Sequence, residues 1–471
     1  MVDGHTVDGR RRAKWGRCAG QWLAMAGLLF LLVQSMPAQG KAESAPDRAR
    51  PVKERILPSA YPDKPSLPPS WTIPVEPLGF SPPGPLYLGQ RNSLVSLDFI
   101  DENRLLFTFR VPGLIHRELK AGETGDGDER KIRAVVLTLP NGNVETEGLW
   151  TLHDRARYLW MLKDGHFLLR DENNLQQGDS HLFLKPLLQF PGTLLDLELD
   201  PSQQYLVSNS HEPAAVPGKL GQVDNPATAA VSLTQDSQSS SNDSSAEAGG
   251  NPAPETPDTV VRILRRESGQ VMLVSRVRAS VHLPINSEGY LETLRGRATD
   301  WTLNLNFFTG GSKILGSVTS TCVPSTSFIA QKVVLAIGCD GLGARRLVAV
   351  STDGRTLWDD LNPDTQVWPV PYASPDGLRL MLETLAVTHP VSAYAPLGSD
   401  DVKGQLVRVI DAATGEVAFQ SPASPTLDAG GNAAFSPSGR RVAVLNAGGI
   451  QVFELPAAPP LPEAGSKQSA H

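Results

Sequence analysis

The sequence contains only three cysteines and no hydrophobic run long enough to span a membrane. Its longest apolar run, residues 22–33, has twelve residues, whereas a membrane-spanning helix needs about 20. A basic region precedes this run and small residues (Ala38, Gly40 and Ala42) follow it, which is the order of an export signal. We therefore predict that residues 1–42 are a signal peptide, that the mature protein has no membrane span, and that it is periplasmic or extracellular. The alternative is a signal that is retained as a membrane anchor.

The sequence also lacks a surplus of basic residues. Its formal net charge is −7 and its isoelectric point is about 5.8. Nucleic acids and anionic membrane surfaces both select a basic face. The charge therefore argues against nucleic acid and against an anionic membrane surface as partners.

Removal of the signal would leave only Cys322 and Cys339. No Cys-x-x-Cys spacing is present, so catalytic dithiol chemistry is not indicated. Two remaining cysteines in an exported protein are most simply joined, and we predict a disulfide between them. The alternative is a pair of buried free thiols, because free cysteine is a common core residue.

Helical periodicity is nearly absent after the signal, and two kinds of hairpin alternate along the chain instead. In the first kind, a turn rich in Asp, Ser, Pro and Gly joins two apolar strands, as Ser-Pro-Asp-Gly does at residues 374–377. It occurs at residues 99–109, 161–170, 198–208, 372–382 and 435–444. The second kind occurs at residues 137–148, 263–274, 306–317, 350–360 and 409–420. Two hairpins repeated in turn describe a four-stranded sheet that recurs.

This repetition predicts an all-β fold, a seven-bladed β-propeller of four-stranded antiparallel blades. We expect the seven units to start near residues 94, 151, 193, 281, 321, 366 and 425. The last unit is one strand short, so we predict that an N-terminal strand closes it, with Gly84–Gln90 as the candidate segment. A pair of β-sandwich domains is the alternative, but it explains less well why the hairpins continue from Leu94 to Leu455.

The remaining segments are expected to lie outside the propeller, which we place at residues 84–456. Residues 43–83 are rich in proline and predict a linker or strap, whose second half should lie on the folded body because it contains Trp71, Ile73 and Phe80. Residues 211–258 are poor in apolar side chains and predict a disordered insertion, and residues 457–471 a disordered tail. Shorter interruptions occur at Lys120–Lys131 and His389–Lys403.

The hairpins resemble those of WD-repeat and YVTN-type β-propellers, and residues 328–360 also resemble a blade of quinoprotein-like propellers. The resemblance covers residues 84–456 and rests on turn chemistry. It departs from regular WD repeats because a Trp-Asp pair occurs only at Trp358-Asp359 and no Gly-His pair accompanies it. No functional residue of these families can be carried over. For exported propellers, the resemblance implies protein-binding scaffolds first, and hydrolases or dehydrogenases second.

Motifs for catalysis are missing. No Gly-x-Ser-x-Gly elbow occurs, and Gly310–Lys313 lacks the spacing of a phosphate loop and is interpreted as a tight turn. Three histidines, His153, His166 and His181, lie in one unit near Asp154 and Asp164, but we interpret them as surface or turn residues. We therefore predict no catalytic, cofactor-binding or metal-binding residue and no cofactor.

The sequence favours an exported, monomeric and non-enzymatic propeller that binds a protein partner, or a peptide or glycan, on one of its faces. The alternative is a propeller enzyme with an axial metal or acid–base site, either lactonase-like or a glycan-active hydrolase.

Overall fold

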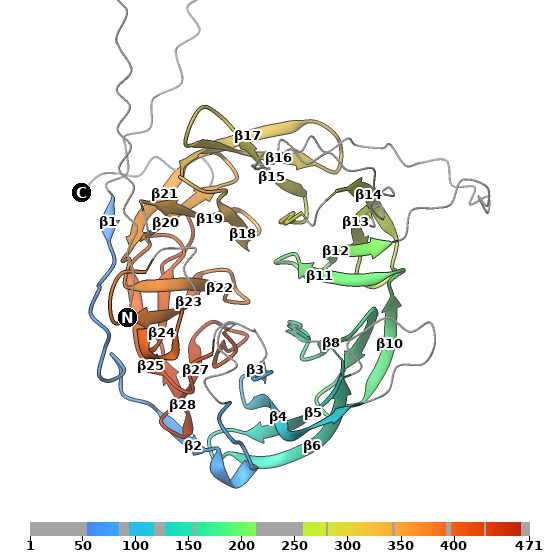
Figure 1. The fold of residues 1–471 in the computed structure, drawn as a ribbon, viewed down its shortest axis with the longest axis vertical. Helices are drawn as coiled ribbons and strands as arrows, with labels where there is room; N and C mark the ends of the chain where they lie inside the picture. Colours follow the sequence, from blue (N-terminus) through green and yellow to red (C-terminus); the bar gives the residue numbers. More distant parts are fainter. Residues whose placement is uncertain are drawn as a thin grey trace, which may run out of the picture. The chain divides into compact units, whose positions relative to one another are not determined.

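The computed structural model describes residues 54–83, 94–116, 128–153, 157–212, 258–278, 281–341, 344–391, 397–427 and 430–462. Within these residues, seven β-sheets follow one another around a central axis and form a ring (Figure 1). The only helices in this part are two 3-10 turns, η1 (Glu76–Leu78) and η3 (Ser399–Asp401). The predicted all-β, seven-bladed propeller is confirmed.

Blades 1 to 3 contain four antiparallel strands each, with the first strand nearest the axis. Blade 1 consists of β3 (Ser96–Asp101), β4 (Arg104–His116), β5 (Asp128–Thr138) and β6 (Asn143–Leu152). Blade 2 consists of β7 (Leu159–Met161), β8 (Phe167–Asp171), β9 (Asn174–Gly178) and β10 (Leu184–Gln189). Blade 3 consists of β11 (Thr193–Leu199), β12 (Tyr205–Glu212), β13 (Asp258–Arg265) and β14 (Val271–Val277).

Blades 4 to 7 continue the ring. Blade 4 consists of β15 (Gly289–Arg295), β16 (Asp300–Phe307) and β17 (Ser312–Thr319). Blade 5 consists of β18 (Ser325–Ala330), β19 (Val333–Asp340), β20 (Ala344–Ser351) and β21 (Thr356–Asn362). Blade 6 consists of β22 (Gln366–Ala373), β23 (Arg379–Val387), β24 (Val402–Asp411) and β25 (Val417–Ala423), and blade 7 of β26 (Ala433–Phe435), β27 (Arg441–Asn446) and β28 (Gly449–Glu454).

The repeat boundaries were predictable from the hairpins. The first strands of six blades begin at residues 96, 159, 193, 325, 366 and 433, and the innermost bridge of blade 4 is formed by Ile285, close to the predicted unit starts. Each hairpin of the first kind joins the two innermost strands of a blade. In blade 6, Asp376 Oδ1 accepts hydrogen bonds from Ser374 Oγ (2.5 Å) and from the Leu378 amide (3.0 Å), and Gly377 has a φ of +73°. The turn is therefore fixed by its own side chains, as the sequence predicts.

Blade 4 departs from the predicted four strands. Residues 283–286 occupy the innermost position but form only one bridge, between Ile285 and Tyr290. Pro284 accepts a hydrogen bond from the Leu291 amide (2.8 Å), but it has no N–H with which to extend the ladder. Proline at this position therefore reduces the inner strand to a single bridge.

The ring is closed by an N-terminal strand, although not by the predicted segment. β2 (Trp71–Pro74) pairs antiparallel with β28 and supplies the fourth strand of blade 7. Gly84–Gln90, the candidate named from the sequence, lies outside the described residues. Upstream, β1 (Arg55–Ile56) pairs parallel with β21 and adds a fifth strand to blade 5. Figure 1 shows this strap, residues 54–80, running along the outer margin of the ring from β1 to β2.

The strap contacts the body as its apolar residues predicted. Ile73 is buried against blades 1 and 7, and the Phe80 ring packs edge-on against the rings of Phe107 (5.3 Å) and Phe109 (5.4 Å). The wedges between blades are filled by similar apolar clusters, such as the one in which Phe419 of blade 6 meets Phe453 of blade 7 at 4.7 Å. The aromatic strand residues thus pack between blades.

The two faces of the ring carry different connections. The turns between the first and second strands contact one another: Gln203 of blade 3 donates to the Met161 carbonyl of blade 2 (2.9 Å), and the Ser438 amide of blade 7 donates to Glu102 of blade 1 (2.7 Å). We call this side the turn face. The connections from second to third strands, which contain all three sequence interruptions, leave from the opposite face because the strands are antiparallel.

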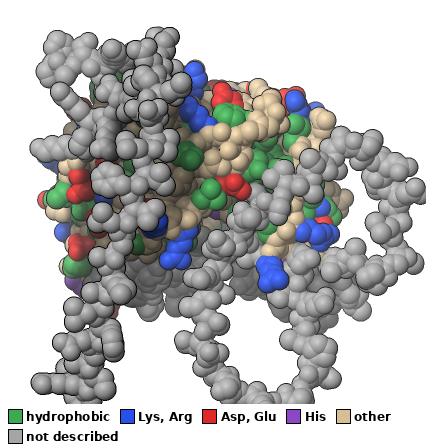
Figure 2. Space-filling view, turned by 90° about the horizontal axis from the view of Figure 1, so that it is seen from above, with side chains coloured by type: hydrophobic (Ala, Val, Ile, Leu, Met, Phe, Trp, Pro, Cys, Tyr) green, Lys and Arg blue, Asp and Glu red, His purple; other side chains and the backbone are tan. Residues whose placement is uncertain are grey.

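No helix within the described residues is long and apolar enough to cross a membrane. On the part of the rim that Figure 2 shows in colour, hydrophobic, basic and acidic side chains are interspersed. The residues predicted to form the signal, and most of the predicted insertion and tail, lie outside the described residues.

Candidate functional site at the propeller axis

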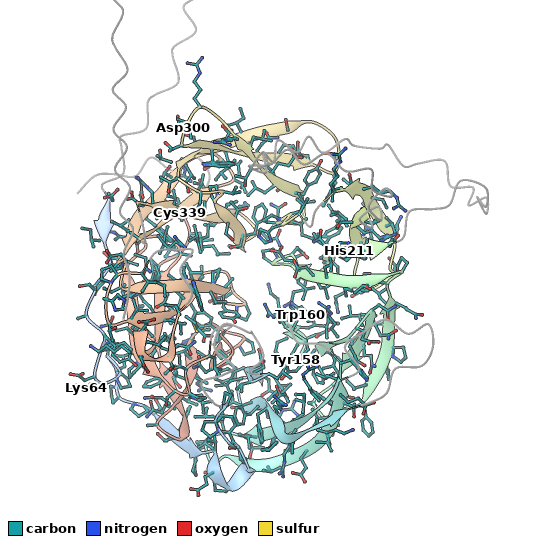
Figure 3. The ribbon with its side chains drawn as sticks, viewed as in Figure 1. Lys64, Tyr158, Trp160, His211, Asp300 and Cys339 are labelled. Atoms are coloured by element: carbon teal, nitrogen blue, oxygen red, sulfur yellow. A yellow bond between two sulfur atoms is a disulfide. The ribbon has the colours of Figure 1, made fainter. Side chains whose placement is uncertain are left out.

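Strand alternation places polar side chains on the axis. In β3, Leu97 and Phe99 are buried in the wedge between blades, whereas Asp98 between them is only half-buried. In β11, Leu197 is buried and the next residue, Glu198, is half-buried. Successive side chains of a strand point to opposite sides, and on these two inner strands a half-buried carboxylate alternates with a buried wedge residue. Figure 3 shows Tyr158 and Trp160 of blade 2 on this inner side, whereas Lys64 of the strap lies at the outer margin.

Arg157 is the cation of this region. It immediately precedes Tyr158, at the end of blade 2 that faces away from the turn face. Its guanidinium carbon lies 5.3 Å from the ring centroid of Trp160 and 5.7 Å from that of Tyr372. Tyr372 belongs to blade 6, across the ring from blade 2 (Figure 1). Arg157 therefore bridges two blades that are not neighbours.

One hydrogen bond orients the guanidinium of Arg157, and it uses only one of the three nitrogens of the group. Nε donates to the Leu159 carbonyl at 3.1 Å, and this is the only hydrogen bond that Arg157 forms within the described part of the chain. The side chain is exposed. Cation–π contacts with two rings restrict its orientation further. Both Nη groups thus have no acceptor among the described residues.

Asp98 is a carboxylate of blade 1 whose pKa the charge of Arg157 lowers. Burial raises its pKa to about 6, although a hydrogen bond from Ser96 Oγ (2.5 Å) and the charge of Arg157 act in the opposite direction. No ion pair joins Asp98 to Arg157 in the described structure. The two opposite charges therefore influence each other without direct contact, and Asp98 changes protonation state within one unit of neutral pH.

Glu383 of β23 is buried within blade 6 and has a structural role. It is 1% exposed, and its carboxylate accepts hydrogen bonds from Gln405 Nε2 (3.0 Å) and from the Gly431 amide (3.3 Å). Burial raises its pKa to about 8, with the backbone N–H groups of Gly431 and Asn432 opposing this rise. Gly431 has a φ of +101°, and a Cβ there would lie 2.3 Å from the Val95 carbonyl oxygen. Glu383 thus anchors a glycine turn against blade 1.

A second polar chain crosses blades 3, 4 and 5. His282 Nδ1 lies 3.3 Å from Glu198 Oε2, and its Nε2 faces the Thr326 carbonyl oxygen at 2.5 Å. Both ring nitrogens face acceptors, so the imidazolium form can donate to both. Burial raises the pKa of Glu198, and Asp196 raises it further, whereas His282 and Arg157 lower it. We define the axial site as Asp98, Arg157, Trp160, Glu198, His282 and Tyr372.

The three histidines that the sequence analysis considered for a metal do not converge. His153 Nδ1 lies 3.1 Å from Asp171 Oδ1, His166 Nδ1 lies 3.3 Å from Asp164 Oδ1, and the His181 amide donates to Asp179 (2.9 Å). Asp154 lies outside the described residues. No group of three or more His, Cys, Asp or Glu residues in the described structure is placed to hold a metal ion.

The two cysteines are joined by a disulfide. Cys339 is the second-last residue of β19, and Cys322 lies in the link between β17 and β18. Ser320 Oγ accepts from the amides of both cysteines, at 2.9 Å for Cys339 and 3.2 Å for Cys322. The bond therefore ties the link between blades 4 and 5 to the second strand of blade 5.

Sequence reasoning gave none of the axial residues a functional role, and it interpreted Trp160 as packing between blades. Their signal was a charged side chain between two apolar residues of an inner strand, as in Leu97-Asp98-Phe99. That pattern shows which residues face away from a wedge, but it does not show that blades 1, 2, 3, 4 and 6 direct them to one place.

The comparisons with known proteins assign no family to this chain. No family model and no curated protein matches this sequence. The structure is similar to the WD40 domain of coronin from Toxoplasma gondii (9% identity, 85% of this chain and 87% of that chain, TM-score 0.41). It is similar to TolB from Acinetobacter baumannii (12% identity, 74% and 77%, TM-score 0.33).

A third similarity is to the acylaminoacyl peptidase of Pyrococcus horikoshii (11% identity, 70% of this chain, TM-score 0.37). This chain spans about half of that peptidase, 52% of its length. Similarities at these levels of identity concern the fold, and the residues of the axial site must carry the functional argument.

Proposed function

We propose that the protein is an exported, non-enzymatic binding module, and that a protein partner docks at the axial site from the face opposite the turn face. The observation that carries this proposal is Arg157, whose two Nη groups have no acceptor among the described residues while Trp160 and Tyr372 restrict the guanidinium. Arginine flanked by aromatic side chains is a frequent centre of protein interfaces. The partner would approach from the side on which Arg157 precedes the first strand of blade 2.

The enzymatic alternative has one observation in its favour. Asp98 and Glu383 both have raised pKa values, about 6 and about 8, and paired carboxyls of this kind often serve as acid and base. Glu383, however, is 1% exposed and already accepts from Gln405 and Gly431. An acid–base group must reach the substrate, so the described geometry supports binding better than catalysis.

Affinity capture tests the docking site. The full-length chain with a C-terminal tag would be expressed in its native host, and proteins captured from the envelope fraction would be compared between the wild type, Arg157→Ala and Arg295→Ala. Arg295 is the matched control because its guanidinium also lies over a tryptophan, 5.8 Å from Trp301, but on blade 4 away from the axis. We expect one stoichiometric partner that is lost only with Arg157→Ala. A partner retained equally by Arg157→Ala would refute docking at the axial site.

Export has a separate test. The disulfide between Cys322 and Cys339 supports an oxidising compartment. Mass spectrometry of the mature protein from fractionated cells should find an N-terminus near Gly40 or Ala42 in the periplasmic or extracellular fraction. An intact N-terminus in the cytoplasmic fraction would contradict export.

A further inference from the structure

We infer that the axial site binds a carboxylate group of a peptide segment, through the two Nη groups of Arg157. This inference rests on the proposed function and specifies the chemistry of the partner at that site. Nε of Arg157 is occupied by the Leu159 carbonyl, so the end of the guanidinium that carries both Nη groups is the one left for a ligand. That end matches the two oxygens of a carboxylate in a planar, bidentate arrangement.

The surroundings of Arg157 favour a monoanion over a dianion. The charges of Asp98 and Glu198 are near enough to interact with Arg157, since Arg157 lowers the pKa of both carboxyls. A phosphate dianion would be attracted to Arg157 and repelled by the two carboxylates about twice as strongly as a carboxylate would, so a second negative charge gains little where two carboxylates oppose one guanidinium. Trp160 and Tyr372, which are packed against the body of the propeller, hold the guanidinium between their rings at 5.3 and 5.7 Å. A carboxylate on a peptide therefore fits these residues best.

A cationic ligand is the opposite possibility, because the axial site also contains acidic residues. Glu198, however, is already opposite His282 (3.3 Å), and Asp98 already accepts from Ser96. Arg157 would repel a cation placed between the two rings. Among the described residues, the two Nη groups of Arg157 are left without an acceptor, so the anion is favoured.

The charge of Asp98 predicts the direction in which carboxylate binding should change with pH. Asp98 is surrounded by Ser96 on its own strand, Arg157 and Tyr158 of blade 2, and Tyr372 and Glu383 of blade 6. When Asp98 is protonated it no longer repels a bound carboxylate. A carboxylate should therefore bind more tightly at pH 5.5 than at pH 7.5, and Asp98→Asn should bind it tightly at both values; a cation would show the reverse.

The experiment is an NMR titration of the full mature chain. The indole signal of Trp160 would be assigned with Trp160→Phe and followed while acetylated Gly/Ala pentapeptides are added up to about 10 mM, which detects millimolar dissociation constants. The first peptide has a free C-terminal carboxylate, the second is amidated with a central glutamate, the third is amidated with a central glutamine, and the fourth is amidated with a central lysine. The first two distinguish a chain terminus from a side chain as the source of the carboxylate.

We expect the Trp160 signal to shift with the first or second peptide and not with the third or fourth. Arg157→Lys should weaken this binding at least about tenfold, because the bidentate arrangement is lost, while Arg295→Ala should leave it unchanged. Absence of a shift with both carboxylate peptides, or equal binding of the glutamine peptide, would overturn the inference. Preferential binding of the lysine peptide would overturn it too.

The two proposals fail in different ways. If Arg157→Ala loses the captured partner but no carboxylate peptide binds, docking at the axial site stands and the carboxylate is wrong. If Arg157→Ala retains the partner, the proposed function itself is wrong. Thermal unfolding of each variant shows whether its fold is intact, and Arg157→Lys keeps the charge should Arg157→Ala not fold.

Discussion

Arg408 in the strap interface and Arg157 in the axial site are both cations held inside the ring, yet their donors are used differently. Arg408 is 1% exposed, and its Nη groups donate to Gln366 Oε1 (3.0 Å), Asn362 Oδ1 (3.3 Å) and the Pro58 carbonyl of the strap (2.9 Å). Burial lowers its pKa to about 10. Arg157 is exposed and uses only Nε.

The difference separates a structural cation from one that can recognise a ligand. A buried guanidinium is tolerated only when the chain supplies acceptors for it, and the strap supplies one of those for Arg408. The strap interface therefore supplies acceptors for both Nη groups of Arg408 within one molecule, although its Nε is buried without an acceptor among the described residues. The axial site has opposite charges that do not touch one another, and a ligand can still be placed between them.

The largest expected loss of folding stability comes from a substitution that breaks the strap interface. Asp360 is fully buried, binds Arg55 of the strap through both oxygens (2.8 and 3.1 Å), and lies near Arg408. Asp360→Ala should destabilise the protein by about 3 kcal/mol, because Arg408 would keep a buried charge without its carboxylate. Urea unfolding would measure this. Glu147→Ala is the control, since the Arg133–Glu147 pair is exposed and is expected to contribute less than about 1 kcal/mol. Equal midpoints for the two variants would contradict the role of Asp360.

The next largest effect is the difference in stability cost between substitutions in the two strands of the strap. Ile73 in β2 is 3% exposed and Ile56 in β1 is 73% exposed. Ile73→Ala should cost about 3 kcal/mol, because it leaves a cavity between blades 7 and 1, while Ile56→Ala should stay within about 0.5 kcal/mol. The same unfolding measurement compares them. A similar loss in both variants would mean that β1, and not only the closing strand, depends on side-chain burial.

The sequence predicted those features of the fold that are local. A turn such as Ser374–Gly377 carries its own hydrogen bonds, so each hairpin was visible without knowing its neighbours. The missing strand of the last blade was visible for the same reason, because the chain turns to proline after Leu455.

The features that the sequence did not predict depend on pairing between distant residues. Trp71–Pro74 and Gly84–Gln90 are both short and apolar beside prolines, and only the register with β28 decides which of them closes the ring. The axial site was missed because Asp98 and Tyr372 are brought together only when the ring closes.

A smaller effect concerns Glu383, which lies between the two regions. Its pKa is about 8 in the folded protein against 4.5 for an unperturbed glutamate. The folded state therefore keeps a proton that the unfolded chain releases, and stability should fall as pH rises from about 5 to 8, by up to about 1.4 kcal/mol per pH unit. Asp98, with a pKa of about 6, adds a loss of the same sign that is nearly complete above pH 7.

Glu383→Gln should remove the part of this slope that persists between pH 6 and 8, about 2 kcal/mol. Its stability at pH 5 should be about 1 kcal/mol lower than that of the wild type, because the amide offers one acceptor instead of two. Chemical unfolding at pH 5, 6, 7 and 8 would follow both proteins. Parallel curves would show that Glu383 does not hold the proton.

The smallest expected effect sharpens the comparison most. Arg157→Ala should change the free energy of unfolding by less than about 0.5 kcal/mol, as should its control Arg295→Ala, because both side chains are exposed. Only Arg157→Ala should lose the partner and the carboxylate peptides. A residue that stabilises nothing measurable, yet is held by one hydrogen bond and two aromatic rings, is placed for recognition. If urea unfolding instead shows a loss as large as that of Asp360→Ala, Arg157 is a structural bridge between blades 2 and 6, and the ligand must be sought elsewhere.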